Sequence, residues 1–179
     1  TLCNREERFM EYKELIKARY SCRKFSNEQI TKEQLDAILE AGQVSLTAKN
    51  LQPQKIYVAQ KEEDLAKIDS LTPCRYGAPT ALIVAYDKTS VYTYPGDKYQ
   101  SGPEDMGIVA THMILGAKDV GVDSCWLNNF DPDKVAEAFG LPENEEVVMI
   151  MDLGYAAEDC APAERHFQTK ELSEMVTYL

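Results

Sequence analysis

The stretch that decides the fold is Thr80-Ala81-Leu82-Ile83-Val84-Ala85-Tyr86. Its length and its content of apolar and β-branched side chains are typical of a β-strand. Successive side chains of a strand point to opposite faces of the sheet, and here both sets are apolar. We therefore expect this strand to be buried on both faces, inside a sheet that helices cover.

The segments before this strand predict three helices and a second strand. A first helix is expected from Glu7 to Ala18, where apolar residues alternate with charges. The second helix begins at a capping box, Thr31-Lys32-Glu33-Gln34, in which the threonine hydroxyl and the glutamine amide satisfy free N–H groups, and it should end near Ser45. A strand is predicted over Lys55 to Ala59 and a short helix over Glu62 to Leu71.

The segments after the strand begin with a loop and a buried helix. Asp87 to Gly102 is rich in tyrosine and shows neither helical nor strand period, so we expect an exposed loop and a candidate lid. From Met106 to Val120, apolar residues occupy almost every face of a helix that Pro103 can begin. This helix should lie inside the molecule, with His112 as a core residue whose polar atoms find partners.

The last part of the chain predicts two more strands and one more helix. The strands are expected over Ser124 to Leu127 and over Glu146 to Leu153, and Asp131-Pro132 supplies the start of the helix between them. The tail from Glu158 to Leu179 has weak helical character and should dock on another surface. Helices and strands mix without a regular βαβ alternation, which predicts a single α+β domain over all 179 residues.

The composition excludes several classes of partner and site. A net charge of −11 repels nucleic acid and acidic membrane surfaces, and no long basic segment offsets it. The five cysteines are odd in number and lack a C-x-x-C pair, and there are only two histidines, so we expect reduced thiols and no metal site. The sequence shows neither a bilayer-spanning stretch nor a signal peptide, which favours a cytoplasmic protein.

Two arginines fall within five residues in the segment Arg19-Tyr20-Ser21-Cys22-Arg23. Arginine binds phosphate with two parallel hydrogen bonds. In an extended run, alternate side chains point to the same side, so both arginines and the serine could meet one anion. The same spacing also fits two solvated surface arginines, and it does not decide between these interpretations.

Three further pieces are candidates for binding. Asn50-Leu51-Gln52-Pro53 places two side-chain amides, which can donate and accept, in a loop before a strand, although a plain turn is the alternative. The stretch from Gly121 to Asp131 holds the only tryptophan, Trp126, which belongs either to the core or to a ligand loop. Arg165 follows near the end.

Taken in this order, the four pieces resemble the nitroreductase family. That family's second motif typically reads Pro-Ser-Ala-x-Asn-x-Gln-Pro-Trp, and Leu46-Thr47-Ala48-Lys49-Asn50-Leu51-Gln52-Pro53-Gln54 stands here. The likeness extends from about Glu14 to the end. It implies an α+β fold with a central, mainly antiparallel sheet of about four to five strands flanked by helices, in an intertwined homodimer with two FMN sites at the interface.

The resemblance also implies which residues meet FMN. Thr47, Asn50 and Gln52 would reach the flavin from the partner subunit, Arg165 would bind its phosphate, and the segment 127–129 would meet the N5 edge of the ring. The full implied set is Arg19, Tyr20, Ser21, Arg23, Leu46, Thr47, Asn50, Gln52, Leu127, Asn128, Asn129 and Arg165.

Three positions depart from the family pattern. Gln54 replaces a tryptophan, and Ala163 replaces a basic residue two positions before the late arginine. Asn129 stands where a glycine often closes the N5 loop, so a left-handed backbone is expected there, which asparagine tolerates better than most residues. The charge missing at Ala163 predicts weaker retention of FMN.

The activity that the resemblance implies is that of an FMN-dependent oxidoreductase. NADH or NADPH would reduce the flavin, and a nitroaromatic, a quinone or a similar conjugated acceptor would reoxidise it in a ping-pong cycle. The cofactor carries this chemistry, so no catalytic side chain is named, and Arg23 is expected to stabilise charge at the N1 and O2 edge. The alternatives are a flavin-binding or flavin-handling protein with little turnover, and a non-flavin dimer that binds another phosphorylated ligand.

Overall fold

The apolar stretch forms β2 (Thr80–Asp87), one of the two central strands of a four-stranded sheet in the computed structural model, which describes residues 11–179. The strand order is β1 (Gln54–Ala59), β2, β4 (Glu145–Gly154) and β3 (Asp123–Leu127). Each of these strands pairs with its neighbours in antiparallel fashion. The predicted mainly antiparallel sheet is thus confirmed.

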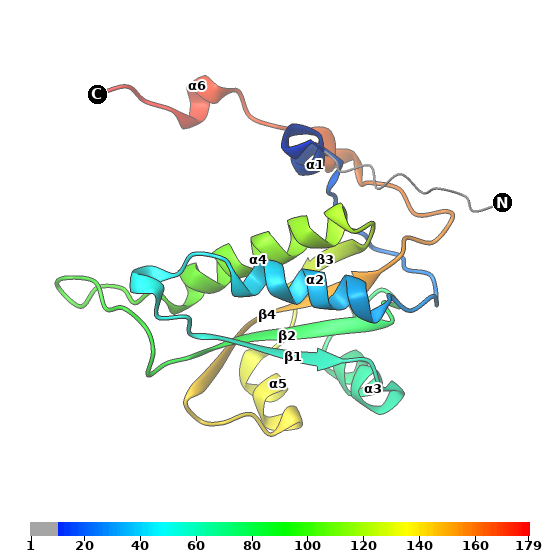
Figure 1. Cartoon of the computed structure of the whole chain (residues 1–179), viewed down its shortest axis with the longest axis horizontal. Coiled ribbons are helices and arrows are strands. Elements are labelled where there is room, and N and C mark those ends of the chain that lie inside the picture. The colour runs from blue at the N-terminus through cyan, green and yellow to red at the C-terminus, as the bar shows by residue number, and fades with distance from the viewer. Residues whose placement is uncertain (1–10) are drawn as a thin grey trace.

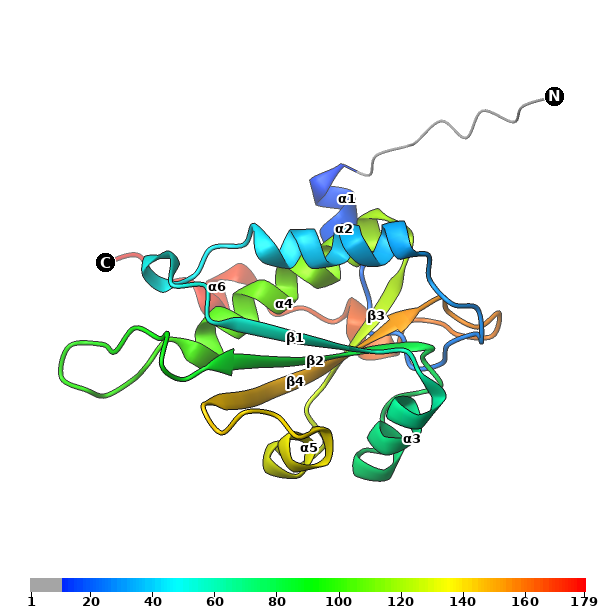
Figure 2. The ribbon, with the colours of Figure 1, turned by 60° about the horizontal axis from the view of Figure 1, so that its bottom comes forward.

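Helices cover both faces of this sheet (Figures 1 and 2). Helices α2 (Lys32–Gln43) and α4 (Gly102–Asp119) pack on one face, whereas α3 (Glu62–Leu71) and α5 (Pro132–Phe139) pack on the other. Helix α1 (Tyr12–Ala18) lies against α4. The predicted start of this first helix falls on residues 7–10, which lie outside the described residues.

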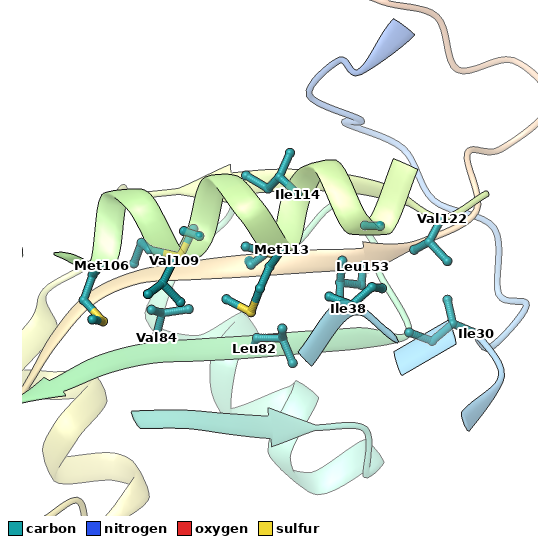
Figure 3. Packing of buried hydrophobic residues seen from close by; sticks show 14 of the residues in the cluster. Ile30, Ile38, Leu82, Val84, Met106, Val109, Met113, Ile114, Val122 and Leu153 are labelled. Carbon is teal, nitrogen blue, oxygen red and sulfur yellow. The ribbon is translucent and has the colours of Figure 1, made fainter. Parts of the chain in front are cut away.

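The side chains of β2 alternate between two buried clusters, as its sequence predicts. Leu82 and Val84 face α4, where Met106, Val109 and Met113 pack onto them (Figure 3). The alternate residues point into a second cluster between the sheet and the layer of α3 and α5. Each fully buried aliphatic side chain contributes about 1.5–3 kcal/mol, so this strand anchors both layers. The second cluster includes Ala81, Ile83, Ala85, Ile68 and Val135.

The helix ends follow local side-chain chemistry. The hydroxyl of Thr31 accepts from the backbone N–H of Gln34 at 3.2 Å, and the Gln34 side chain accepts in return from the Thr31 N–H at 3.0 Å. The predicted capping box is therefore confirmed, although α2 ends at Gln43, two residues before Ser45. At α5, Asp131 caps the start and Gly140 ends the helix with a φ of 63°.

The outer face of α4 differs from its prediction. His112 is only half-buried and lines a groove with Tyr12 of α1 and Val44 at the end of α2. Its expected place in the core is wrong, because the side of the helix that it occupies points away from the sheet. Tyr12 and Val44 are themselves 66% and 72% exposed, so this groove is an uncovered apolar surface in the single chain.

Two segments extend beyond the layers. The predicted loop between β2 and α4 projects past the sheet, with a bridge between Thr93 and Gln100 (Figure 2). The tail holds a 3-10 helix, η2 (Glu164–Phe167), and a single turn, α6 (Leu172–Met175), and it runs away from the body of the chain (Figure 1). Within the described part of the chain, no helix combines the length and the apolar character that crossing a membrane requires.

Candidate functional site

A cavity of about 270 Å³ brings together two segments that lie far apart in the sequence. The segment after α1 supplies two guanidinium groups and a hydroxyl to its wall, and η2 supplies a third guanidinium. Among residues 11–179, no carboxylate forms a salt bridge with any of these three arginines. The cavity therefore presents uncompensated positive charge to an anion. Its lining residues are Arg19, Ser21, Arg23, Ala163, Arg165 and His166.

Backbone pairing with β3 sets the alternation of the Arg19–Arg23 segment. The N–H of Cys22 donates to the carbonyl of Ser124 at 2.9 Å, and Ser21 forms a parallel bridge with the same residue. In this extended conformation residues 19, 21 and 23 line the cavity, whereas Cys22 is fully buried on the opposite side. The prediction that alternate side chains of this segment share one side is confirmed.

Tyr20 does not line this cavity. Its ring meets the ring of His166 edge-on, with centroids 6.3 Å apart, and the Lys118 ammonium lies 5.5 Å from the ring centroid. Burial raises the pKa of the Tyr20 hydroxyl, and the negative charge of Asp123 raises it further. Tyr20 is thus a neutral side chain that packs against His166, one of the residues that line the cavity.

The residues 47–52, here called the amide turn, form a strained but well-bonded loop after α2. The buried Thr47 hydroxyl accepts from the Gln52 N–H at 3.1 Å, and the Gln52 amide donates to the Asn50 side-chain oxygen at 3.0 Å. Lys49, Asn50 and Gln52 all have positive φ, near 50°. From α4, the Asp105 carboxylate accepts from the Ala48 N–H at 2.7 Å. The loop therefore holds both amides at the surface in one defined arrangement.

The amide turn and the cavity lie in different places in the single chain. The turn follows the C-terminal end of α2, whereas the Arg19–Arg23 segment runs beside β3 (Figure 2). No residue of the turn lines the cavity, and Leu46 just before the turn is 65% exposed. One chain thus assembles only part of the residue set that the sequence predicts.

The end of β3 supplies the third predicted piece. Leu127 is buried, and the Asn128 amide donates to the Val148 carbonyl at 2.8 Å while its oxygen accepts from the half-buried Trp126 indole. Asn129 is absent from the residues with positive φ, so the expected left-handed backbone there is wrong. Side-chain hydrogen bonds, rather than a tight turn, fix this loop.

Cys74 connects this loop with the Arg19–Arg23 segment. The Asn129 amide donates to the Cys74 sulfur at 3.5 Å, and this bond, a hydrogen bond from Tyr76 and the charge of Arg23 lower the pKa of the thiol. Arg23 and the loop after β3 therefore share one neighbourhood, beside the cavity. Within residues 11–179, no group of three or more histidine, cysteine or acidic side chains could hold a metal ion.

A protein-family comparison agrees with this arrangement. The model described as the nitroreductase family matches residues 16–75 and 71–155. This chain belongs to the nitroreductase family. Its fold is the nitroreductase fold, because a nitroreductase family protein of Clostridium difficile 630, solved by crystallography, superposes with a TM-score of 0.88 at 38% identity, over 94% of this chain and 98% of that chain.

Two further relatives cover most of this nitroreductase family member. A protein of Methanothermobacter thermautotrophicus whose name includes NAD(P)H nitroreductase is 30% identical over 159 residues, which are 84% of this chain and 80% of the relative. An FMN-dependent nitroreductase of Clostridium difficile R20291 is 25% identical, with a TM-score of 0.68, over 81% of this chain and 87% of that chain.

Sequence reasoning missed two residues of this candidate site. His166 lines the cavity next to Arg165, and its position beside a predicted phosphate ligand was a signal that could have found it. Cys74 lies between α3 and β2, far from any predicted piece, and nothing in its local sequence points to the loop that it contacts. Only the fold brings it there.

Proposed function

We propose that this protein is an FMN-dependent oxidoreductase that takes its electrons from NADH or NADPH. The observation that carries the proposal is the cavity with three arginines and a serine hydroxyl, a donor set that fits a phosphate monoester. Membership of the nitroreductase family and the names of the relatives support the cofactor and the reductant. FMN, when bound, would supply hydride transfer at its N5 atom.

The phosphate end of the flavin would occupy the cavity. Arg19 and Arg165 approach it from opposite ends of the chain, and the Ser21 hydroxyl can donate a further hydrogen bond. Ala163 lines the same cavity without a charge, so we propose that FMN is retained less firmly than in relatives with a basic residue there.

FMN titration of arginine variants tests this assignment. Each hydrogen bond to a charged group contributes about 1.5–3 kcal/mol, so Arg19→Ala and Arg165→Ala should each weaken FMN binding by about 10- to 100-fold. Lys134→Ala is the matched control, because Lys134 lies on the exposed surface of α5 and pairs only with Asp131 in the described part of the chain. Unchanged FMN affinity in both arginine variants would exclude the phosphate assignment.

The ring end would lie beside Arg23, Asn128 and Asn129. Reduction of a flavin places negative charge at its N1 and O2 edge, and a fixed cation nearby stabilises that form. We therefore expect Arg23→Ala to lower the flavin reduction potential and to slow reduction by NAD(P)H, with Arg23→Lys closer to the parent. An unchanged potential would refute this role.

A second copy of the chain would complete the site. The amide turn does not reach its own cavity, and the apolar tail residues Phe167, Leu172 and Tyr178 are 72%, 73% and 94% exposed. We propose a homodimer in which the partner's tail covers the groove beside His112 and the partner's amide turn meets the flavin.

Light scattering and a shortened chain test the dimer. The full chain should run as a dimer with one FMN per chain, and deletion of residues 171–179 should shift it toward monomer and lower FMN affinity together. A monomer that binds one FMN with the affinity of the full chain would contradict the shared site.

The acceptor is proposed to be a nitroaromatic, a quinone or a similar conjugated electrophile, reduced in a ping-pong cycle beside the loop between β2 and α4. NAD(P)H oxidation that depends on an added acceptor supports turnover. A yellow protein without such oxidation would instead favour a flavin-handling role, and a colourless protein that cannot be loaded with FMN would favour another phosphorylated ligand.

A further inference from the structure

Two cysteine sulfurs meet behind the cavity. The Sγ atoms of Cys22 and Cys160 lie 3.6 Å apart although 138 positions separate the residues in sequence. Among residues 11–179, this is the one contact between two cysteine sulfurs. Cys22 is fully buried, and Cys160 is half-buried. The pair therefore combines a fully buried cysteine with a partly exposed one.

Paired backbone segments bring the two sulfurs together. The N–H of Ala157 donates to the Lys24 carbonyl at 2.9 Å, and Phe25 forms an antiparallel bridge with Ala156. The Lys24 ammonium also forms an ion pair with Asp159, next to Cys160. The contact thus belongs to a two-stranded ribbon with several bonds rather than to a single loose loop.

The ribbon joins the two walls of the cavity. Cys22 lies between Ser21 and Arg23 on one wall, and Cys160 precedes Ala163 and Arg165 on the other. We propose that Cys22 and Cys160 form a reversible disulfide that ties these walls together and slows the release of FMN. The disulfide goes beyond the proposed function, whereas its effect on FMN rests on it.

The oxidation needs a small movement and a named oxidant. A disulfide bond is about 2.05 Å long, so the two sulfurs, now 3.6 Å apart, must approach by about 1.5 Å. A hydroperoxide would first oxidise the accessible Cys160 thiol to a sulfenic acid and leave as an alcohol, or as water in the case of hydrogen peroxide. The Cys22 sulfur then attacks the sulfenic sulfur, the S–S bond forms, and the hydroxyl leaves as water with the Cys22 proton.

The burial of Cys22 fits this order of events. Desolvation raises the pKa of the Cys22 thiol to about 12, so this sulfur stays protonated and resists direct oxidation. The same shift slows the attack of Cys22 on Cys160, and the contact between the two sulfurs offsets this effect. Two electrons leave the thiol pair in total, and the hydroperoxide accepts both.

The disulfide and the flavin should affect each other equally. Tying the segment that carries Arg165 to the Arg19–Arg23 segment removes part of the freedom that FMN binding must otherwise restrict. A coupling at the lower end of the usual range corresponds to about a fivefold change in affinity, expressed here as slower FMN release. By thermodynamic linkage, bound FMN should make the disulfide harder to reduce by the same factor.

The test uses the full chain with Cys3→Ser as the common background, which leaves Cys74 and its contact with Asn129 intact. After treatment with hydrogen peroxide, intact mass should fall by about 2 Da, and peptide mapping should assign the link to Cys22 and Cys160. Addition of dithiothreitol should restore both thiols. FMN release, followed by flavin fluorescence, should be about fivefold slower in the oxidised protein, and Cys160→Ser should abolish both the link and the difference.

Each other outcome overturns a defined part of the argument. A gain of oxygen at Cys160 with a free Cys22, or a link between two chains, overturns the disulfide. Equal rates of FMN release from the oxidised and the reduced protein would show that the disulfide does not hold the two cavity walls together. A disulfide that forms in a protein unable to bind FMN in either state supports the pair and refutes the proposed function instead.

Discussion

Replacement of Asp152 by asparagine should stabilise the protein, and the gain should increase with pH. Asp152 lies on β4 and belongs to the face of the sheet that α3 and α5 cover. It is fully buried, and among the described residues neither carboxylate oxygen has a hydrogen-bond partner. Burial raises its pKa to about 9, and the nearby charge of Arg75 offsets only part of this effect.

The size of the effect follows from the difference between the folded and unfolded pKa. An unfolded aspartate has a pKa of about 3.9. Between this pH and about 9 the folded protein keeps a proton that the unfolded chain has released, so each pH unit removes about 1.4 kcal/mol of stability. The stabilising contribution is complete below about pH 3.9 and is lost as the pH rises through the folded pKa. From pH 5 to pH 8, Asp152 should therefore lower the free energy of unfolding by up to about 4 kcal/mol.

Urea unfolding of the parent and of Asp152→Asn at pH 5, 6, 7 and 8 measures this slope. Taking the difference between the two proteins cancels the titration of all groups that the substitution leaves alone. The asparagine amide costs about 1–3 kcal/mol where it lacks partners, but that cost does not depend on pH. Asp159→Asn is the control, since Asp159 is exposed and paired with Lys24, and it should show no gain across this range. A difference that stays flat from pH 5 to pH 8 would refute the buried neutral carboxyl.

Three further predictions follow from single contacts. Gly102→Ala would place a Cβ 2.2 Å from the ring of the fully buried Tyr86, and it should lower the free energy of unfolding in urea by about 1–3 kcal/mol. In the same helix, a Cβ at Gly107 meets no atom within 4 Å, so Gly107→Ala should raise this free energy by about 0.5–1 kcal/mol. Equal changes in the free energy of unfolding for the two variants would contradict the close packing of Gly102 against Tyr86. Thr31→Ala removes the first half of the capping box and should cost about 1 kcal/mol, with Thr31→Ser close to the parent. Asp105→Ala removes the acceptor that holds the amide turn and should weaken FMN binding, with partial rescue by Asp105→Asn; intact FMN affinity would show that the turn does not need this bond.

The helices and strands were predictable because the apolar residues of each recur in the sequence at the spacing of its buried face. The apolar run of β2 predicted burial on both faces, and the two clusters confirm it. The capping box at Thr31 was readable because both of its partners lie within four residues. Periodicity did not reveal which side of α4 meets the sheet, since almost every side of that helix is apolar. His112 was therefore assigned to the core, whereas it lies on the outer face.

The cavity was beyond local prediction for a physical reason. The spacing of Arg19 and Arg23 fits a surface as well as a site, and only the pairing with Ser124 on β3 sets which side their chains face. Backbone hydrogen bonds do not depend on particular side chains, so the sequence does not indicate this pairing. The same holds for the contact of the Asn129 amide with Cys74, which the sequence positions of the two residues do not suggest.

The segment from Arg19 to Phe25 links the cavity with the loop after β3 through its backbone. Ser124 on β3 accepts from Cys22, and β3 leads directly to the loop with Asn128 and Asn129. Tyr76, two residues after Cys74, accepts from the N–H of Phe25, while Ala157 binds Lys24 at the start of the chain segment that ends at Arg165. The cavity and the loop after β3 are therefore positioned by one common segment rather than by separate supports. A change that loosens this segment should disturb the cavity and the loop after β3 together. Loss of a single arginine should affect only the part that this arginine faces.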